Sequence, residues 1–454
     1  MKFKTPLLAG ILILSSMYIS AQEVWSLQKC IDHALQNNIQ IKQQELQTEI
    51  SRNNSKQSKY NLLPSVGGSL GESINMGRNI DYGTNTYVNK TTNSTSVGVS
   101  ASATLFNGFK NYHQIKKSEL DLLAGIAGLD KIKNDIQLNI ASAYLNILYN
   151  VELVKVSQDQ IATTNLQLDR TNKLVEAGKL PKGDLLKINA QLAQEELQLV
   201  SYQNSLESSY LTLSQILELQ SPKDFMIEIP EVSVDKQAKD PMTVEASYNV
   251  ALGVLPEIKQ YEAYLKASEK DHKIAFANYF PSLSVSAGFN SGYSSTIGAL
   301  ATPGDINSAF ILTPFWDQIT NSNYGGYISL SLQIPIFNKF QVRNNVKNSK
   351  IRMSQAELNL ENTKKNVYKS IQQANADAVA ALKKYYATQK SVESLEESFR
   401  YSQEKYNVGK LNSIDYNLSK NQLANAQSEL LRAKYEYVFK TKILDFYRGN
   451  PFSL

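Results

Sequence analysis

The chain has 454 residues, of which 42% are hydrophobic and 20% are charged, and its formal net charge is +5. This length suggests two or three compact domains. So small a net charge argues against nucleic acid or an anionic surface as a partner. The single cysteine, Cys30, excludes an intrachain disulfide and is expected to be a buried, inert thiol.

The first 21 residues read as a secretory signal peptide. A basic start, MKFK, precedes the apolar run PLLAGILILSSMYI and small residues ahead of Gln22, so we expect cleavage after Ala21. Cleavage would remove Lys2 and Lys4 and lower the net charge to +3. An apolar run of about 14 residues is too short to span a membrane as a helix. We therefore expect an exported protein without a transmembrane helix.

The remaining chain is a duplication. YNLLPSVGGSL around Pro64 matches NYFPSLSVSAGF around Pro281 at an offset of 217 residues, and ATLFNGF matches QIPIFNKF at an offset of 231. The stretch between these motifs is therefore 14 residues longer in the second half, which indicates an exposed loop. The predicted organisation is a signal peptide over 1–21, a first repeat over 22–220, a proline-rich linker over 221–241, a second repeat over 242–448 and a C-terminal tail over 449–454.

Each repeat opens with about 35 residues of helical periodicity that end before a proline. The two helices are expected over Val24–Tyr60 and Met242–Tyr279. Alternating segments follow, such as LSVSAGF and YISLSLQIPIF, in which apolar residues face one side and Ser, Gly or Gln the other. We predict β-hairpins over 65–106 and 282–337, with strands of about ten residues, the length of a membrane-spanning β-strand. Taken alone, the same strands also fit the edge of a soluble sandwich.

A long helix is predicted after each hairpin. No proline occurs between Asn107 and Glu176, and apolar residues repeat there at seven-residue spacing, among them Ile140, Ile147 and Val154. This spacing predicts coiled-coil packing, and about 70 residues would form a rod of roughly 105 Å. The second repeat carries two such rows on one helix, which indicates neighbours on both sides, as for helices around a cylinder.

Both long helices are expected to end in the same Gly-Lys-Leu turn, within tip turns over 177–184 and 408–415. Glycine favours the left-handed conformation that ends a helix. An aspartate follows each glycine by six residues, near the start of the return helix, where the helix dipole favours an acid. Plain helix N-capping is the alternative role for these acids. The residues in question are Gly178, Lys179, Leu180 and Asp184, and Gly409, Lys410, Leu411 and Asp415.

Together these features resemble the TolC-type outer-membrane efflux channel family over essentially the whole mature chain. The shared features are the signal peptide, the duplicated half, the proline before each hairpin, the LFNG and IFNK junctions and the paired turns. The resemblance implies a mixed α and β membrane protein, a homotrimer with a twelve-stranded β-barrel in the outer membrane, continued by a helical periplasmic cylinder. It also implies an exit duct for efflux or type I secretion, opened at its tip by a periplasmic adaptor and an inner-membrane pump.

The resemblance further assigns gate residues. Asp415 stands where the family has a gate acid, Asp184 is its first-repeat counterpart, and Tyr406 matches the aromatic before the turn. Residues 178–180 and 409–411 are expected to contact the adaptor. The chain departs from the family at Leu418, where a second acid is usual, and at Leu411, where an arginine is usual. The salt-bridge network of the gate is therefore incomplete, and whether the gate is tightly closed at rest stays open.

Enzymatic functions are not indicated. The histidines, His33, His113 and His272, are scattered, without an acid or cysteine at metal-ligand spacing, and are expected on solvated helix surfaces. The sequence has no nucleophile elbow and no phosphate- or dinucleotide-binding glycine loop, so no cofactor is expected. The alternative function is a trimeric coiled-coil adhesive or structural surface protein. Neither the cargo nor the identity of the pump and adaptor can be derived from the sequence.

Overall fold

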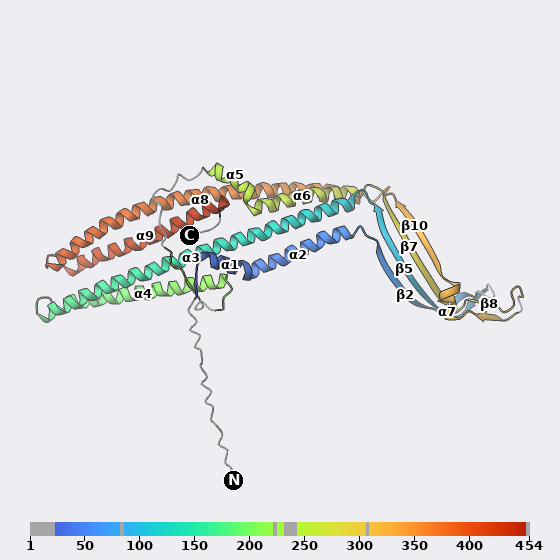
Figure 1. Cartoon of the computed structure of the whole chain (residues 1–454), viewed down its shortest axis with the longest axis horizontal. Helices are drawn as coiled ribbons and strands as arrows, with labels where there is room; N and C mark the ends of the chain where they lie inside the picture. Colours follow the sequence, from blue (N-terminus) through green and yellow to red (C-terminus); the bar gives the residue numbers. More distant parts are fainter. Residues whose placement is uncertain (1–22, 82–85, 221–224, 231–242, 306–307, 451–454) are drawn as a thin grey trace, which may run out of the picture. The chain divides into compact units, whose positions relative to one another are not determined.

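The computed structural model describes residues 23–81, 86–220, 225–230, 243–305 and 308–450 (Figure 1). The predicted signal peptide and most of the predicted linker lie outside these residues. The elements of the first half are β1 (Glu23–Trp25), α1 (Leu27–Asn37), α2 (Ile39–Tyr60), β2 (Ser65–Asn75), β3 (Arg78–Asp81), β4 (Thr86–Asn89), β5 (Thr92–Phe106), α3 (Lys110–Glu176), α4 (Lys182–Ile216) and β6 (Phe225–Ile227). Those of the second half are α5 (Val244–Val254), α6 (Pro256–Ala277), β7 (Ser282–Ser294), β8 (Gly298–Leu300), β9 (Phe310–Leu312), α7 (Phe315–Asp317), the π-helix η2 (Gln318–Ser322), β10 (Gly325–Gln333), α8 (Gln341–Asn407) and α9 (Ser413–Tyr447).

The chain divides into two compact units. The sheet unit comprises residues 44–130 and 256–365, and the hairpin unit comprises the described residues within 1–43, 131–255 and 366–454. The long helices α3 and α8, each of 67 residues, contribute their first parts to the sheet unit and the rest to the hairpin unit. None of the described helices combines the length and the hydropathy needed to cross a membrane.

The sheet unit contains a four-stranded antiparallel sheet in the order β10-β7-β5-β2. Its register places apolar residues beside apolar residues, since Ile328 pairs with Ala287, which pairs with Ala101. The opposite side carries serine beside serine, and Ser65 Oγ lies 3.0 Å from Ser102 Oγ. Cross-strand neighbours share a face, so the alternation in the sequence separates an apolar side from a hydroxyl-rich side.

The outer strands of this sheet, β2 and β10, have no further partner among the described strands. The apolar side is also uncovered in the single chain, where Ile328 is 84% and Leu70 is 77% exposed. Unpaired edges and a large exposed apolar face are features that soluble monomers normally avoid. The strand edges therefore need further strands and the apolar face needs an apolar environment, neither of which the described part of one chain supplies.

Each opening helix is broken, where the sequence predicted one continuous helix. α1 ends and α2 begins at Asn38, and α5 ends and α6 begins at Leu255; both residues have extended backbone. Pro256 explains the second break, because a proline disfavours helical conformation in the preceding residue. At the first break, the Asn38 side chain accepts the Gln40 amide at 3.0 Å and so caps the new helix.

The core of the hairpin unit forms where β1 pairs in parallel with β6. Tyr144 of α3 is buried against these strands, and its hydroxyl donates to the Glu228 carbonyl at 2.7 Å. Cys30 is fully buried nearby, and burial raises the pKa of its thiol to about 12. As expected from the sequence, such a thiol stays protonated at neutral pH and is unreactive.

The longer connection of the second repeat is ordered around Gln318, the first residue of η2. This side chain is fully buried. Its amide donates to the Thr313 carbonyl at 2.8 Å and accepts the Ser294 amide at 2.9 Å, and Asn323 donates to it at 3.1 Å. Gln318 therefore ties the 14-residue excess of this repeat to the end of β7.

The substitution Gln318→Leu is expected to loosen this connection. It keeps the volume approximately but leaves buried backbone groups without partners, at a cost of about 1–3 kcal/mol each. Hydrogen exchange measured by mass spectrometry should become faster in residues 294–323. Thr320→Ala, at an exposed position two residues away, is the matched control and should leave exchange unchanged. Equal exchange in Gln318→Leu and the wild type would contradict this role.

Candidate functional site

The candidate site lies in the two turns that join α3 to α4 and α8 to α9. Gly178 and Gly409 adopt left-handed backbone, with φ of 68° and 73°. In each turn the amide of the following lysine, Lys179 or Lys410, donates at 2.8 Å to the carbonyl five residues earlier. This is the bonding of a Schellman motif, which ends a helix and which a side chain at the glycine would strain. The duplicated sequence thus builds two turns of the same geometry.

The two aspartates lie in the first turns of α4 and α9, but neither is the N-cap residue. The N-caps are Pro181 and Asn412. Asn412 accepts the Asp415 amide at 2.9 Å, which caps α9, and donates its own side-chain amide to the Asp415 carboxylate at 2.8 Å. Asp184 is instead paired with Lys187 at 3.3 Å. The N-capping role considered for the aspartates is therefore wrong.

The aromatic residue before the second turn packs inside the α8–α9 hairpin. The ring of Tyr406 stacks on Tyr416 with centroids 4.7 Å apart and an interplanar angle of 28°. The ring of Phe399 also contacts Tyr416, with centroids 5.4 Å apart and the rings tilted by 46°. Tyr416 is buried, and this burial raises the pKa of its hydroxyl to about 12. The three rings fix the start of α9 on the end of α8.

At the turns, an arginine that sequence analysis did not identify connects the two hairpins. Arg170 of α3 donates through its Nη2 atom to the Asn407 carbonyl at 2.6 Å, and its Nη1 atom contacts the Asn407 side chain. Lys179 and Lys410 are exposed, and neither forms an ion pair in the described part of the chain. Leu180 and Leu411 are half-buried. The polar connection at this end is therefore made by Arg170 and not by the lysines of the turns.

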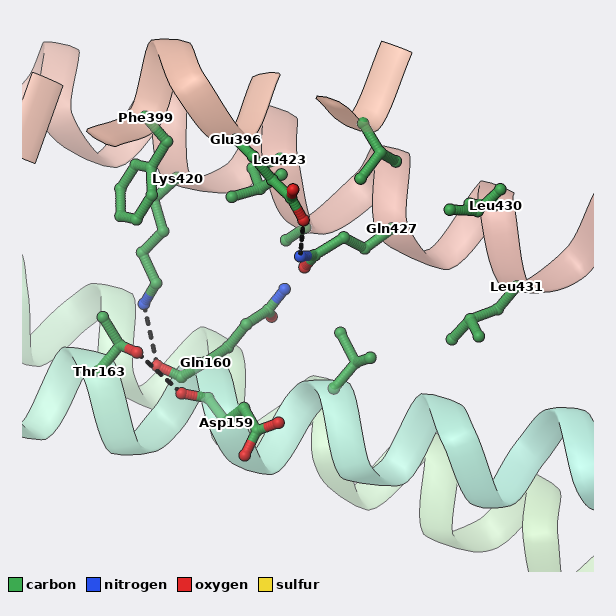
Figure 2. Close-up of a pocket in the computed structure, with 13 residues that line it drawn as sticks. Asp159, Gln160, Thr163, Glu396, Phe399, Lys420, Leu423, Gln427, Leu430 and Leu431 are labelled. Carbon is green, nitrogen blue, oxygen red and sulfur yellow. Dashed lines mark hydrogen bonds between the residues drawn. The ribbon is translucent and has the colours of Figure 1, made fainter. Parts of the chain in front are cut away.

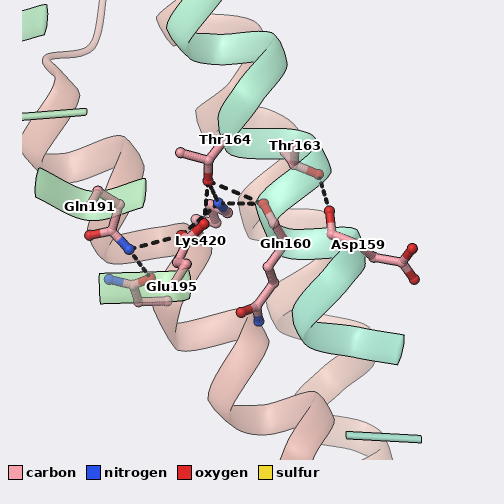
Figure 3. A network of polar contacts seen from close by, with 8 residues as sticks. Asp159, Gln160, Thr163, Thr164, Gln191, Glu195 and Lys420 are labelled. Atoms are coloured by element: carbon pink, nitrogen blue, oxygen red, sulfur yellow. Dashed lines mark hydrogen bonds and ion pairs between the residues drawn. The ribbon is translucent and has the colours of Figure 1, made fainter. Parts of the chain in front are cut away.

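A buried polar network joins the hairpins further along the helices (Figure 3). The Lys420 ammonium on α9 lies 2.8 Å from the Glu195 carboxylate on α4 and donates to the Gln160 carbonyl on α3 at 3.0 Å. Thr164 donates to Glu195 at 2.5 Å and is also in contact with Lys420, while Gln191 donates to Glu195 at 2.9 Å. Both charged side chains are buried, at 5% and 7% exposure.

Burial disfavours the charged form of Lys420 more than Glu195 stabilises it. The pKa of Lys420 is lowered, first because burial disfavours the ammonium, and the hydrogen bond and charge of Glu195 oppose this lowering only in part. Removing one partner of a buried ion pair is strongly destabilising, whereas replacing both by apolar residues is often neutral. The network therefore specifies which helices meet, and at what register, more than it adds stability.

A pattern in the sequence could have identified this pair. Buried coiled-coil positions alternate in steps of four and three residues. Glu195 falls at such a position between Leu192 and Leu199, and Lys420 falls between Tyr416 and Leu423. Two oppositely charged residues at positions that apolar side chains normally occupy indicate a buried pair. Their pairing across 225 residues of sequence needed the structure.

Beside the network, a cavity of about 400 Å³ separates α3 from the α8–α9 hairpin (Figure 2). Leucines of α9 and Phe399 line it, together with the carboxylate-bearing residues Asp159 and Glu396. The Lys420 stem passes along the cavity, while its ammonium reaches toward α3. Apolar packing between the hairpins is thus incomplete here, and the buried polar network supplies the contact.

The histidines do not form part of this site. All three are half-buried, contrary to the solvated surface positions that the sequence predicted. The His33 ring lies 5.0 Å from Trp25, and His272 Nδ1 lies 2.9 Å from Ser349 Oγ. Among the described residues, no group of three or more His, Cys, Asp or Glu side chains is arranged to hold a metal ion.

Comparison with known proteins gives consistent matches. A family model described as outer membrane efflux protein matches residues 30–218 and 248–448. The chain is 22% identical over 444 residues to outer membrane protein TolC of Escherichia coli, covering 96% of this chain and 84% of that protein. It is also 22% identical over 420 residues to toxin and drug export protein A of Aggregatibacter actinomycetemcomitans, covering 91% and 83%.

Solved structures share the fold. The chain superposes on a structure of CusC with a TM-score of 0.78 at 18% identity, covering 94% of this chain and 92% of that one. The outer membrane protein VceC of Vibrio cholerae gives a TM-score of 0.77 at 16% identity, covering 94% and 97%. These matches confirm the resemblance that the motifs of the sequence indicated.

The turn glycines are expected to tolerate alanine poorly. Gly409→Ala places a side chain in left-handed backbone, at a cost of about 1–2 kcal/mol. The Lys410 amide, which bonds within the turn, should then exchange hydrogen faster. Gly183→Ala is the matched control, because Gly183 lies within α4, where alanine is favoured by up to about 1 kcal/mol. Equal protection of the turn in Gly409→Ala and wild type would contradict the assigned motif.

Breaking the buried pair of Lys420 and Glu195 is expected to destabilise the hairpin unit, and replacing both residues is expected to restore most of the stability. Lys420→Met leaves the Glu195 carboxylate buried without its cation and should destabilise the hairpin unit by about 3–5 kcal/mol. Combining it with Glu195→Leu should restore most of that loss. Hydrogen exchange across α4 and α9 provides the measurement. Lys173→Met, which breaks the exposed pair with Asp169, is the control and should have little effect.

If Lys420→Met alone behaves like Lys173→Met, the pair does not hold the hairpins together. If the double variant is as unstable as the single one, the loss comes from packing and not from the unpaired charge. Either result contradicts the account of the network given above.

Proposed function

Because this chain belongs to the outer membrane efflux protein family, we propose that it forms a trimeric exit duct for efflux through the outer membrane. Each copy gives its four main strands to one twelve-stranded barrel. The helices continue as a tube in the periplasm. The duct has no chemistry of its own, and a periplasmic adaptor and an inner-membrane pump supply the cargo and the energy.

The main support for a trimer is that the four-stranded sheet is incomplete in a single chain. β2 and β10 have no partner on their outer edges among the described strands, and the apolar side of the sheet is exposed. Strands in a membrane must pair all their backbone groups, so a four-stranded sheet has to close with strands from other copies. Lipid would then cover the side with Ile328, and the serine side would face a water-filled interior.

The tip turns are the proposed gate. Three copies would place six turns around one opening, with Asp184 and Asp415 of each copy near its rim. A ring of carboxylates binds cations at a constriction. Tyr406 would fix the second hairpin in its resting position by stacking on Tyr416, at 4.7 Å. Residues 178–180 and 409–411 would meet the adaptor.

The adhesin alternative is not favoured. An adhesin needs only one anchor and one rod-like stalk. Here both repeats carry a strand pair, a 67-residue helix and a Schellman turn. Membership of the family also supports transport over adhesion. No relative is matched closely enough to assign the cargo.

The carboxylates of the tip should control ion flow through the duct. In planar lipid bilayers, Asp415→Asn is expected to lower cation selectivity and to weaken block by Mg²⁺ severalfold, because the charge ring loses three carboxylates. Asp184→Asn should act in the same direction, and the double variant should act more strongly than either. Glu393→Gln, at an exposed position within α8, is the control.

If the Asp415 and Asp184 variants conduct as the wild type does, the tip is not the constriction. If the wild-type protein gives no conductance even after mechanical or chemical opening of the tip, the duct itself is contradicted. Trimer formation is scored separately by mass, so that a failure to assemble is not mistaken for a closed gate.

A further inference from the structure

A second cavity lies in the sheet unit, where the strands meet the helices. Its volume is about 430 Å³. The start of α3 and the end of α6 line it, and we call it the junction pocket: Gly108, Phe109, His113, His272, Lys273, Phe276, Ala277 and Phe280. None of these residues was assigned a role by the sequence, and the gate does not use them. The pocket combines aromatic rings with basic groups, and none of its lining side chains carries a carboxylate.

The pocket is built by a close approach of two helices. Gly108 has φ of 65°, and a Cβ there would lie 2.7 Å from the Phe280 Cβ and 2.8 Å from the Ala277 carbonyl. Phe109 follows with φ of 64°, a left-handed conformation that costs a residue with a side chain about 1–2 kcal/mol. Phe109 is nonetheless 66% exposed, and its ring lies edge to face with Phe106, with centroids 5.6 Å apart. The close approach at Gly108 thus sets Phe109 beside Phe276 and Phe280 in the wall of the pocket.

In two polar side chains of the pocket, those of His113 and Lys273, a charged or hydrogen-bonding group has no partner among the described residues. His113 Nδ1 is shielded from solvent, and no described protein group bonds to it. The pKa of His113 is lowered, first by burial and then by the positive charges of Lys273 and Lys270. Lys273 is exposed and forms no ion pair in the described part of the chain, while the adjacent carboxylate of Asp271 is paired with Arg352 at 3.2 Å. The pocket therefore presents positive charge that no described carboxylate neutralises.

We propose that the junction pocket binds the phosphate-bearing headgroup of an anionic membrane lipid. Lys273 and His113 would hold the phosphate, and the rings of Phe109, Phe276 and Phe280 would hold the start of the lipid chains. This inference rests on the proposed function, since it requires that the strands lie in the outer membrane and that the helices begin at its periplasmic surface. Three phenylalanines line the same pocket as the basic groups, and free phosphate would make no contact with that apolar wall, which is why a lipid is the occupant proposed.

The test uses the full mature trimer in detergent and native mass spectrometry. The probe is dihexanoylphosphatidylglycerol, an anionic lipid short enough to stay monomeric in water. Lys273→Gln should weaken its binding by roughly tenfold, in line with the loss of one charge-assisted contact. Phe109→Ala should weaken it severalfold. Dihexanoylphosphatidylcholine, with a zwitterionic headgroup, should bind less tightly than the anionic probe to the wild type.

The duplication provides matched controls. Phe340 is the second-repeat counterpart of Phe109, with φ of 61° and 57% exposure, and it does not line the junction pocket. Lys266 is an exposed lysine on α6 outside the pocket. Phe340→Ala and Lys266→Gln should therefore bind the probe as the wild type does.

Three outcomes would overturn the proposal. They are equal binding by Lys273→Gln and Lys266→Gln, equal binding by Phe109→Ala and Phe340→Ala, and equal affinity for inorganic phosphate and the anionic lipid. The last would reduce the pocket to a simple anion site. The same spectra report the mass of the assembly. Absence of a trimer would contradict the proposed function, whereas a trimer whose lipid binding ignores these substitutions would contradict this inference alone.

Discussion

Apolar side chains at seven-residue spacing along two 67-residue helices are the constraint on which the rest of the structure depends. Such helices need their apolar rows covered, and the return helices α4 and α9, of 35 residues each, are too short to run along their whole length. The sheet has the same need, since the outer edges of β2 and β10 have no partner among the described strands and its apolar side is exposed. One chain is therefore incomplete at both its helices and its strands. In the proposed trimer, further copies of the chain would satisfy both needs at once.

Because the chain is duplicated, the sequence signals of the fold occur twice, and much of the fold could be predicted from them. Heptad spacing, strand alternation and the two Gly-Lys-Leu turns depend on neighbours in sequence, and each signal occurs twice. The break at Asn38 was missed, because a helical period continues across it and the asparagine acts through its own side chain. The corresponding break before Pro256 has a local signal, the proline itself, although the apolar period continues across it.

The candidate site was predicted less completely than the fold. The turn glycines and both aspartates lie in the tip turns, but the residues that connect the two hairpins were not found. Arg170 and the pair of Lys420 with Glu195 join segments more than 200 residues apart, and no local pattern encodes such a pairing. The resemblance to the family places Leu411 and Leu418 at positions where an arginine and an acid are expected. In this chain the ion pair of Lys420 with Glu195 connects the hairpins; it is buried among three helices and lies away from the turns.

The central claim is that three copies enclose one channel, and single-particle electron microscopy of the mature protein in detergent tests it most directly. The account predicts particles with three-fold symmetry, a central lumen, and a helical tube on the order of 100 Å long by the rise of an α-helix. Monomers, dimers or solid rods without a lumen would contradict it. Such particles would favour the alternative function, a coiled-coil surface protein.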